Sequence, residues 1–208
     1  MVDIYAFLER FEDQLVDAFG DNLAFFGLQG SWGRGEAGPE SDIDLVVLLH
    51  RCSYDDLVGY RQLVDSFDES RLLCGFISSV ETLCHWDVAD RVNLILDTRP
   101  IVGSLEELVG PVGMEDVRLA LVESLSALHH ALTHSIVHAP DLSWLEGLRK
   151  SMRFVVRLVH YYDTGSYVHR FSDLSSLVDD DMQRRILLSE DVDAESLWLW
   201  CDRLLRSL

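Results

Sequence analysis

Two aspartates separated by one residue, Asp42 and Asp44, stand at the start of the apolar run 43–49. Residues i and i+2 of a β-strand point to the same face, so the two carboxylates would project side by side. Like charges held this close repel each other, and a divalent cation between them relieves the repulsion. Mg²⁺ suits the pair, because it keeps several waters and uses one or two protein carboxylates together with phosphate oxygens of a substrate. The pair therefore predicts a metal site for Mg²⁺, or for Mn²⁺ in its place.

A glycine-rich segment precedes the aspartates and reads Gly27-Leu28-Gln29-Gly30-Ser31-Trp32-Gly33-Arg34-Gly35. A Gly-Ser turn after a strand lets backbone N–H groups approach a phosphate closely, and the Ser31 hydroxyl adds a donor. Gly30 and Ser31 are therefore the candidate ligands of a phosphate group, and Arg34 is a candidate positive charge beside it. Turn chemistry alone offers another interpretation, which is a glycine-rich hairpin followed by an Asp-x-Asp that caps a strand.

The pattern G-S-x-G-R-G followed by S-D-I-D-L, with Asp42 eleven positions after Ser31, closely resembles the signature of the DNA polymerase beta-like nucleotidyltransferases. The order of a sheet-containing part and a helical part is similar to that of kanamycin nucleotidyltransferases and minimal nucleotidyltransferases. The resemblance covers the first half of the chain by motif and the second half by helical content. It implies transfer of a nucleoside monophosphate, AMP from ATP, to a hydroxyl group, with pyrophosphate leaving.

In this superfamily a third carboxylate from a neighbouring strand completes the metal site and helps to activate the attacking hydroxyl. A strand predicted at 72–78 would place Cys74 or Gly75 where this acid is expected. Thiols do not suit Mg²⁺. The alternative to an enzyme is therefore a protein of the same fold that lacks the third metal carboxylate and binds nucleotide or a partner without turnover.

Acids outside the motif are candidates for the missing role. A strand predicted at 92–96 contains Asn93, and Asp97 lies four positions further on, on the same strand face. Asp97 equally fits a residue that initiates a turn. Glu123 lies among apolar residues of a predicted helix, and the resemblance implies a general base from such a helix, while a solvated helix acid is the plain alternative. Glu81 most simply starts a helix.

The elements that must position these residues fall into two groups along the chain. Apolar periodicity predicts helices at 2–19 and 57–67, and short apolar runs predict strands at 22–28, 43–49, 72–78 and 92–96. After Met114 the pattern is helical, over 117–137, 142–162, 174–178 and 194–205. We therefore expect an α+β fold, in which a mixed-sheet nucleotidyltransferase domain at 1–110 precedes an all-helical bundle domain at 111–208.

The charge balance limits the partners. The 208 residues include 36 acidic and 17 basic side chains, which gives a formal net charge of -19. Proteins that bind nucleic acid rely on Lys and Arg to neutralise phosphates, so this balance argues against a nucleic-acid partner. It favours a cationic small-molecule acceptor, of which an aminoglycoside is one, or an anion that arrives with metal ions.

The remaining features concern location and packing. The N-terminus lacks the pattern of a signal peptide and no run is apolar enough for a membrane span, so we expect a cytoplasmic protein with no membrane partner. Four cysteines without a C-x-x-C spacing are interpreted as small buried hydrophobic residues. Trp198 and Trp200 lie in the apolar part of the last helix and fit either the core or a homodimer contact.

Overall fold

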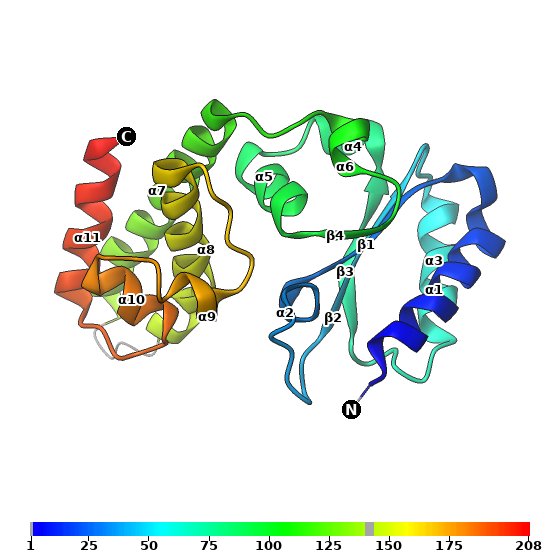
Figure 1. Cartoon of the computed structure of the whole chain (residues 1–208), viewed down its shortest axis with the longest axis horizontal. Coiled ribbons are helices and arrows are strands. Elements are labelled where there is room, and N and C mark those ends of the chain that lie inside the picture. The colour runs from blue at the N-terminus through cyan, green and yellow to red at the C-terminus, as the bar shows by residue number, and fades with distance from the viewer. Residues whose placement is uncertain (1, 140–143) are drawn as a thin grey trace. The chain divides into compact units, whose positions relative to one another are not determined.

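The computed structural model describes residues 2–139 and 144–208, which form two compact units (Figure 1). The first unit comprises the described residues up to Asp87 together with Asn93–Val112. The second comprises Val88–Val92 and the described part of Gly113–Leu208. The chain therefore passes from the first unit to the second, back to the first, and finally into the second.

A mixed four-stranded sheet forms the centre of the first unit, in the order β3-β2-β1-β4. Its strands are β1 (Leu23–Gln29), β2 (Ile43–Leu49), β3 (Leu73–Ser79) and β4 (Arg99–Val102). Strand β1 is antiparallel to both β2 and β4, whereas β2 and β3 run parallel. Alternation along β2 sends Leu45 and Val47 to one face of the sheet and Val46 and Leu48 to the other.

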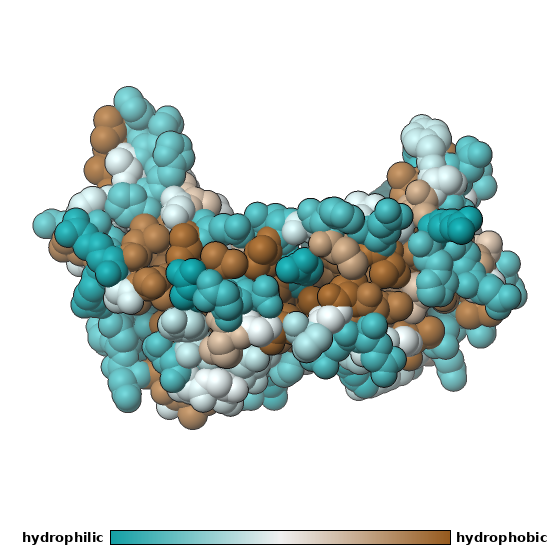
Figure 2. Space-filling view, turned by 90° about the horizontal axis from the view of Figure 1, so that it is seen from above, coloured by the Kyte–Doolittle hydropathy of each residue, from teal (hydrophilic) through white to brown (hydrophobic). Residues whose placement is uncertain are grey.

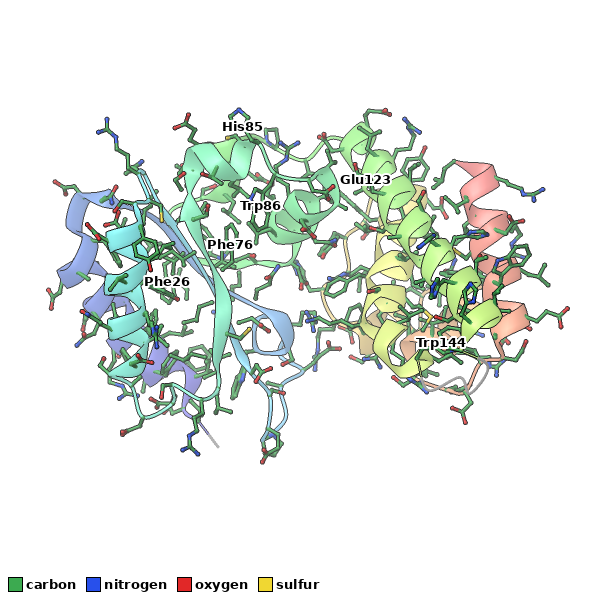
Figure 3. The ribbon with its side chains drawn as sticks, turned by 180° about the vertical axis from the view of Figure 1, so that it is seen from behind. Phe26, Phe76, His85, Trp86, Glu123 and Trp144 are labelled. Carbon is green, nitrogen blue, oxygen red and sulfur yellow. The ribbon has the colours of Figure 1, made fainter. Side chains whose placement is uncertain are left out.

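Helices cover both faces of this sheet (Figure 1). On one face, α1 (Ile4–Phe19) and α3 (Tyr54–Asp65) bury an aromatic cluster in which the rings of Phe11 and Phe26 stack 5.7 Å apart. Three further helices contribute buried leucines to the other face, namely α4 (Val80–Cys84), α5 (Val88–Asp97) and α6 (Leu105–Val109). Phe76 belongs to this second face and meets Trp86 at a centroid distance of 4.4 Å (Figure 3). Two short helices, η1 (Gly20–Asn22) and α2 (Gly30–Arg34), flank β1.

The predicted strand at 92–96 is wrong, because these residues lie inside helix α5. A short apolar run does not distinguish a strand from a buried helical segment. In the structure, Ala89 and Val92 are buried three positions apart, which is the helical spacing. The fourth strand is Arg99–Val102, which contains Pro100 and lies at an edge of the sheet, where proline is tolerated.

The second unit is helical. Its main helices are α7 (Met114–His138), α8 (Leu145–Thr164) and α11 (Ala194–Ser207), with the shorter α9 (Phe171–Leu174) and α10 (Asp181–Leu187). The helices predicted at 117–137, 142–162 and 194–205 correspond to α7, α8 and α11, and the first two residues of the second range lie outside the described residues. The short helix predicted at 174–178 is wrong in position, because it shares only Leu174 with α9, and α10 was not predicted. The α+β fold, with a mixed sheet followed by a helical region, is confirmed.

The core of the second unit is apolar around the buried side chain of Arg157. Trp200 is buried, as one of the two interpretations of the last helix required, and the neighbouring Trp198 donates through Nε1 to Thr133 Oγ1 on α7 at 3.0 Å. The Arg157 guanidinium lies 4.8–4.9 Å from three aromatic ring centroids, those of Phe154, Tyr167 and Phe171. No helix in the described ranges is both long and apolar enough to cross a membrane.

Gly75 offers a test of the β2–β3 pairing. Its φ is +143°, and a Cβ atom at this position would overlap the backbone oxygen of Leu45. We expect Gly75→Ala to lower the free energy of unfolding by about 2 kcal/mol or more, since strained backbone alone costs on the order of 1–3 kcal/mol. In the control Gly59→Ala, where the added methyl meets nothing within 4 Å in helix α3, stability should rise by about 1 kcal/mol. Urea unfolding measures both, and an unchanged Gly75→Ala protein would contradict the pairing.

Candidate active site

The aspartate pair lies at the start of β2. Asp42 is exposed and immediately precedes the strand, and Asp44 is its second residue and is half-buried. Asp44 pairs with Gln29 of β1 on one side and with Cys74 of β3 on the other. Alternation along β2 places Asp44 on the same face as Val46. The strand therefore brings a carboxylate to the edge of the buried face that α4, α5 and α6 cover.

The glycine-rich turn begins directly beside Asp44. Gln29, the partner of Asp44, is the last residue of β1, and Gly30 opens helix α2 with a φ of +68°. A Cβ atom on Gly30 would overlap Asp44 Oδ2, so the backbone of Gly30 lies against the carboxylate. Glycine is required here both for the positive φ and for the space. The structure thus brings two of the predicted site residues, Gly30 and Asp44, into contact.

Hydrogen bonds within the motif fix the shape of the turn. Helix α2 ends at Gly35, whose N–H donates to Trp32 O at 3.1 Å, and the Glu36 N–H donates to Ser31 O at 2.8 Å. The Trp32 indole donates to Ser41 O at 3.3 Å, which ties the turn to the residue before Asp42. The motif by itself assigns no role to Trp32, although an indole N–H between a glycine turn and an acidic strand needs an acceptor nearby. The first N–H groups of a helix have no acceptor within it, so Gly30 and Ser31 open α2 as potential anion donors.

Arg34 lies between two carboxylates. Its Nη1 donates to Asp97 Oδ2 at 2.8 Å and its Nε donates to Glu36 Oε2 at 3.2 Å. The Arg34 side chain is 9% exposed and the Asp97 side chain 1% exposed. The predicted strand position of Asp97 is wrong, because Asp97 is the last residue of helix α5. Its carboxylate binds Arg34.

The neighbouring strand β3 supplies no acid to the pair. Cys74 lies directly opposite Asp44 and is exposed, and Gly75 lies opposite Leu45. Across residues 2–139 and 144–208, no group of three or more His, Cys, Asp or Glu side chains is placed to hold one metal ion. The interpretation of the cysteines as buried is wrong for Cys74 and Cys84, which are exposed. It holds for Cys201, whose burial, with a smaller effect of Asp202, raises the thiol pKa to about 12.

Glu123 belongs to the second unit and comes from helix α7 (Figure 3). Its Oε2 accepts a hydrogen bond from the Ala89 N–H at 3.1 Å. Ala89 is the second residue of helix α5, where backbone N–H groups have no acceptor within the helix and a negative charge is favourable. Glu123 therefore caps helix α5. The other candidate acid, Glu81, lies in the first turn of α4, as expected for a residue that starts a helix.

The family model for the nucleotidyltransferase domain matches residues 8–107, which contain the glycine turn, the aspartate pair and all four strands. Residues 8–107 are a nucleotidyltransferase domain of the DNA polymerase beta-like superfamily. The resemblance drawn from the motif is confirmed.

Two relatives of the chain are known as aminoglycoside nucleotidyltransferase (4'), one from Staphylococcus aureus and one from Bacillus sp.. Each is 27% identical over 79 residues, which are 36% of this chain. The matched part spans 31% of the length of each relative, or about a third.

A solved structure resembles almost the whole chain. Spectinomycin adenyltransferase AAD(9) from Enterococcus faecialis, crystallised with ATP and spectinomycin, aligns with a TM-score of 0.64 at 16% identity. The alignment covers 97% of this chain and 99% of that protein. At this identity the likeness establishes a shared fold, which extends from the nucleotidyltransferase domain through the helical region.

A pair of substitutions in the nucleotidyltransferase domain tests the contact between the turn and Asp44. Gly30 and Gly35 have similar φ values of +68° and +70°, but a Cβ at Gly35 would meet nothing within 4 Å. We expect Gly35→Ala to cost about 1–2 kcal/mol of unfolding free energy through its backbone alone. Gly30→Ala should cost more, because the methyl group also displaces the Asp44 carboxylate. Chemical unfolding measures both free energies, and equal losses in the two variants would contradict the contact.

Proposed function

We propose that this protein transfers a nucleoside monophosphate, AMP from ATP, to a hydroxyl group of a small molecule. The observation that carries the proposal is the contact of Gly30 with Asp44, which joins a phosphate-binding turn to a carboxylate pair at the start of one strand. The matched family and the fold shared with an adenyltransferase crystallised with ATP support it.

The residues of the motif would have separate roles in this transfer. Asp42 and Asp44 offer carboxylate oxygens, the ligands that Mg²⁺ and Mn²⁺ prefer, so these two side chains would hold the metal ion. When bound, the ion would offset the charge of the triphosphate and of the departing pyrophosphate. Gly30 and Ser31 would hold phosphate oxygens through the opening of α2. In-line nucleotidyl transfer needs little covalent participation by the protein. The main task of this site would therefore be to hold the reactants in place.

We further propose that the acceptor is a cationic small molecule, with aminoglycosides as the first class to test. The formal net charge of -19 attracts cations. Hydrophilic side chains cover much of the face in Figure 2, with apolar patches between them. Two matched relatives are known as aminoglycoside nucleotidyltransferases, and the solved structure with this fold holds spectinomycin.

A second candidate function is nucleotide binding without turnover. Cys74 favours it, since a thiol lies opposite Asp44 at the register position where a metal-binding acid would lie. Both functions require the glycine turn and the aspartate pair, and they differ in whether an acceptor is modified.

Transfer is tested with ATP labelled in its α-phosphate, Mg²⁺ and a panel of aminoglycosides that includes spectinomycin. We expect labelled AMP to appear on at least one acceptor. Asp44→Asn should reduce the rate about a hundredfold or more, because a metal ligand supplies several kcal/mol of transition-state stabilisation. The matched control is Asp65→Asn, an exposed acid at the end of α3 in an ion pair with Arg61, which should leave the rate unchanged.

Thermal unfolding separates the two candidate functions. A rise in melting temperature with Mg²⁺ and ATP that Asp44→Asn abolishes, without transfer to the panel or to acceptors in a cell extract, supports binding without turnover. No rise with ATP, GTP, CTP or UTP would contradict both.

The general-base role of Glu123 stays a hypothesis, and two substitutions separate it from the cap on α5. We expect Glu123→Ala to lower the free energy of unfolding by about 1 kcal/mol, the typical cost of losing a helix cap. Glu123→Gln keeps an acceptor oxygen and should preserve stability and transfer. A loss of transfer of about a hundredfold in Glu123→Gln at unchanged stability would establish the base instead.

A further inference from the structure

The ion pair between Arg34 and Asp97 joins the motif to a residue 63 positions further along the chain. We infer that Asp97 is a positioning residue, which holds the Gly30–Arg34 turn against Asp44 by fixing Arg34. The inference rests on the proposed function for its consequence in nucleotide binding, while the positioning itself is a property of the protein without ligand.

Two hydrogen bonds and burial together fix the orientation of the Arg34 guanidinium. Arg34 uses two different nitrogens for two carboxylates, Nη1 for Asp97 at 2.8 Å and Nε for Glu36 at 3.2 Å. A planar guanidinium held at two edges cannot rotate without breaking one of these bonds. With only 9% of the Arg34 side chain and 1% of the Asp97 side chain exposed, water is a poor substitute for either partner.

The backbone around Asp97 also packs closely against the motif. A Cβ on Gly33 would lie 2.7 Å from Leu28 O and 3.8 Å from Asp97 O. A Cβ on Gly27 would lie 2.7 Å from Thr98 Cγ2 and 2.9 Å from Arg99 O. Residues 97–99 therefore run along β1 and the turn, and the two glycines permit this approach. The side chain of Asp97 adds its ion pair with Arg34 to this close backbone packing.

Arg34 and Gly30 are the two ends of one short helix, α2. A segment of a single turn moves as a body, so the position of Arg34 determines where Gly30 and Ser31 lie relative to Asp44. Asp97 thus acts on the phosphate-binding residues through Arg34, across the length of α2. Glu36, which lies just beyond the turn, supplies the second carboxylate of this anchor.

The alternative, in which Arg34 itself binds phosphate, predicts the opposite effect of Asp97→Asn on the affinity for ATP. If Arg34 bound phosphate itself, Asp97→Asn would release a cation toward the nucleotide, and affinity for ATP would stay the same or rise. If Asp97 positions the turn, Asp97→Asn weakens ATP binding although the cation is kept. The double variant of Asp97→Asn and Arg34→Gln should then bind ATP no more weakly than Arg34→Gln alone, because Arg34→Gln already breaks the link to Asp97.

Site-resolved hydrogen exchange on the full chain without ligand tests the positioning. The reporters are the amides of Gly35 and Glu36, which donate within the turn to Trp32 and Ser31. We expect Asp97→Asn to speed exchange at these two amides about tenfold, as local opening, with unchanged exchange in the central strands β1 and β2. The matched control Glu69→Gln breaks the Arg10–Glu69 pair of the same unit, which is 2.9 Å long and involves no motif residue. It should leave the turn amides unchanged.

Two results of the hydrogen-exchange experiment would overturn the inference. Unchanged turn amides in Asp97→Asn mean that the turn keeps its position without the carboxylate. Equal acceleration of the turn and strand amides means that the pair serves overall stability alone. Titration of the parent and of Asp97→Asn with ATP and Mg²⁺ measures the functional consequence. We expect the affinity for ATP to fall about tenfold in Asp97→Asn. Unchanged or tighter ATP binding in this variant contradicts positioning. If the parent binds no nucleotide, the proposed function fails, and hydrogen exchange still decides the role of Asp97.

Discussion

The register between β1 and β2 is the constraint on which the site depends. Gln29 lies opposite Asp44, and the chain turns immediately after Gln29, so the first residue of the turn meets the carboxylate. A slip of one residue in an antiparallel pair sends every side chain of a strand to the opposite face. Such a slip would carry Asp44 away from the turn and bury it among the residues that α1 and α3 cover. The register that places Leu45 and Val47 on one buried face and Val46 on the other therefore also determines where Asp44 lies.

The sequence predicted the parts whose signals are local. The helix at 2–19 and the strands at 22–28 and 43–49 correspond to α1, β1 and β2, because helical periodicity ending at Gly20 marks the helix and short apolar runs mark the strands. The motif indicated Gly30 and Asp44 as members of one site through their spacing. What local signals could not provide was the pairing of Arg34 with Asp97, since an ion pair between distant segments depends on the whole topology. The apolar run around Asn93 misled for a different reason, because a run of only five residues is too short for its period to separate a helix from a strand.

The excess of acidic residues has more than one structural use. Lys150 is the only lysine in the chain, and the other 16 basic residues are arginines. Arginine presents a planar fork that matches carboxylates, and Arg118 uses it on Glu115 with two hydrogen bonds of 2.9 and 2.7 Å. Arg34 uses the same fork in a buried setting between Glu36 and Asp97. Some acidic side chains thus fix the orientation of arginines, and the remaining excess of negative charge attracts cations.

The distance in sequence between Arg34 and Asp97 bears on how the protein forms during its synthesis. The glycine turn and the aspartate pair leave the ribosome well before the residue that anchors them, which follows 63 positions later. At 5–20 residues per second, that interval is roughly 3–13 s. Through that interval the nascent chain carries a turn whose buried arginine lacks its Asp97 partner. The loop between the two residues must close before the turn reaches its final form, so we expect the proposed nucleotide site to be among the last parts of its unit to become ordered.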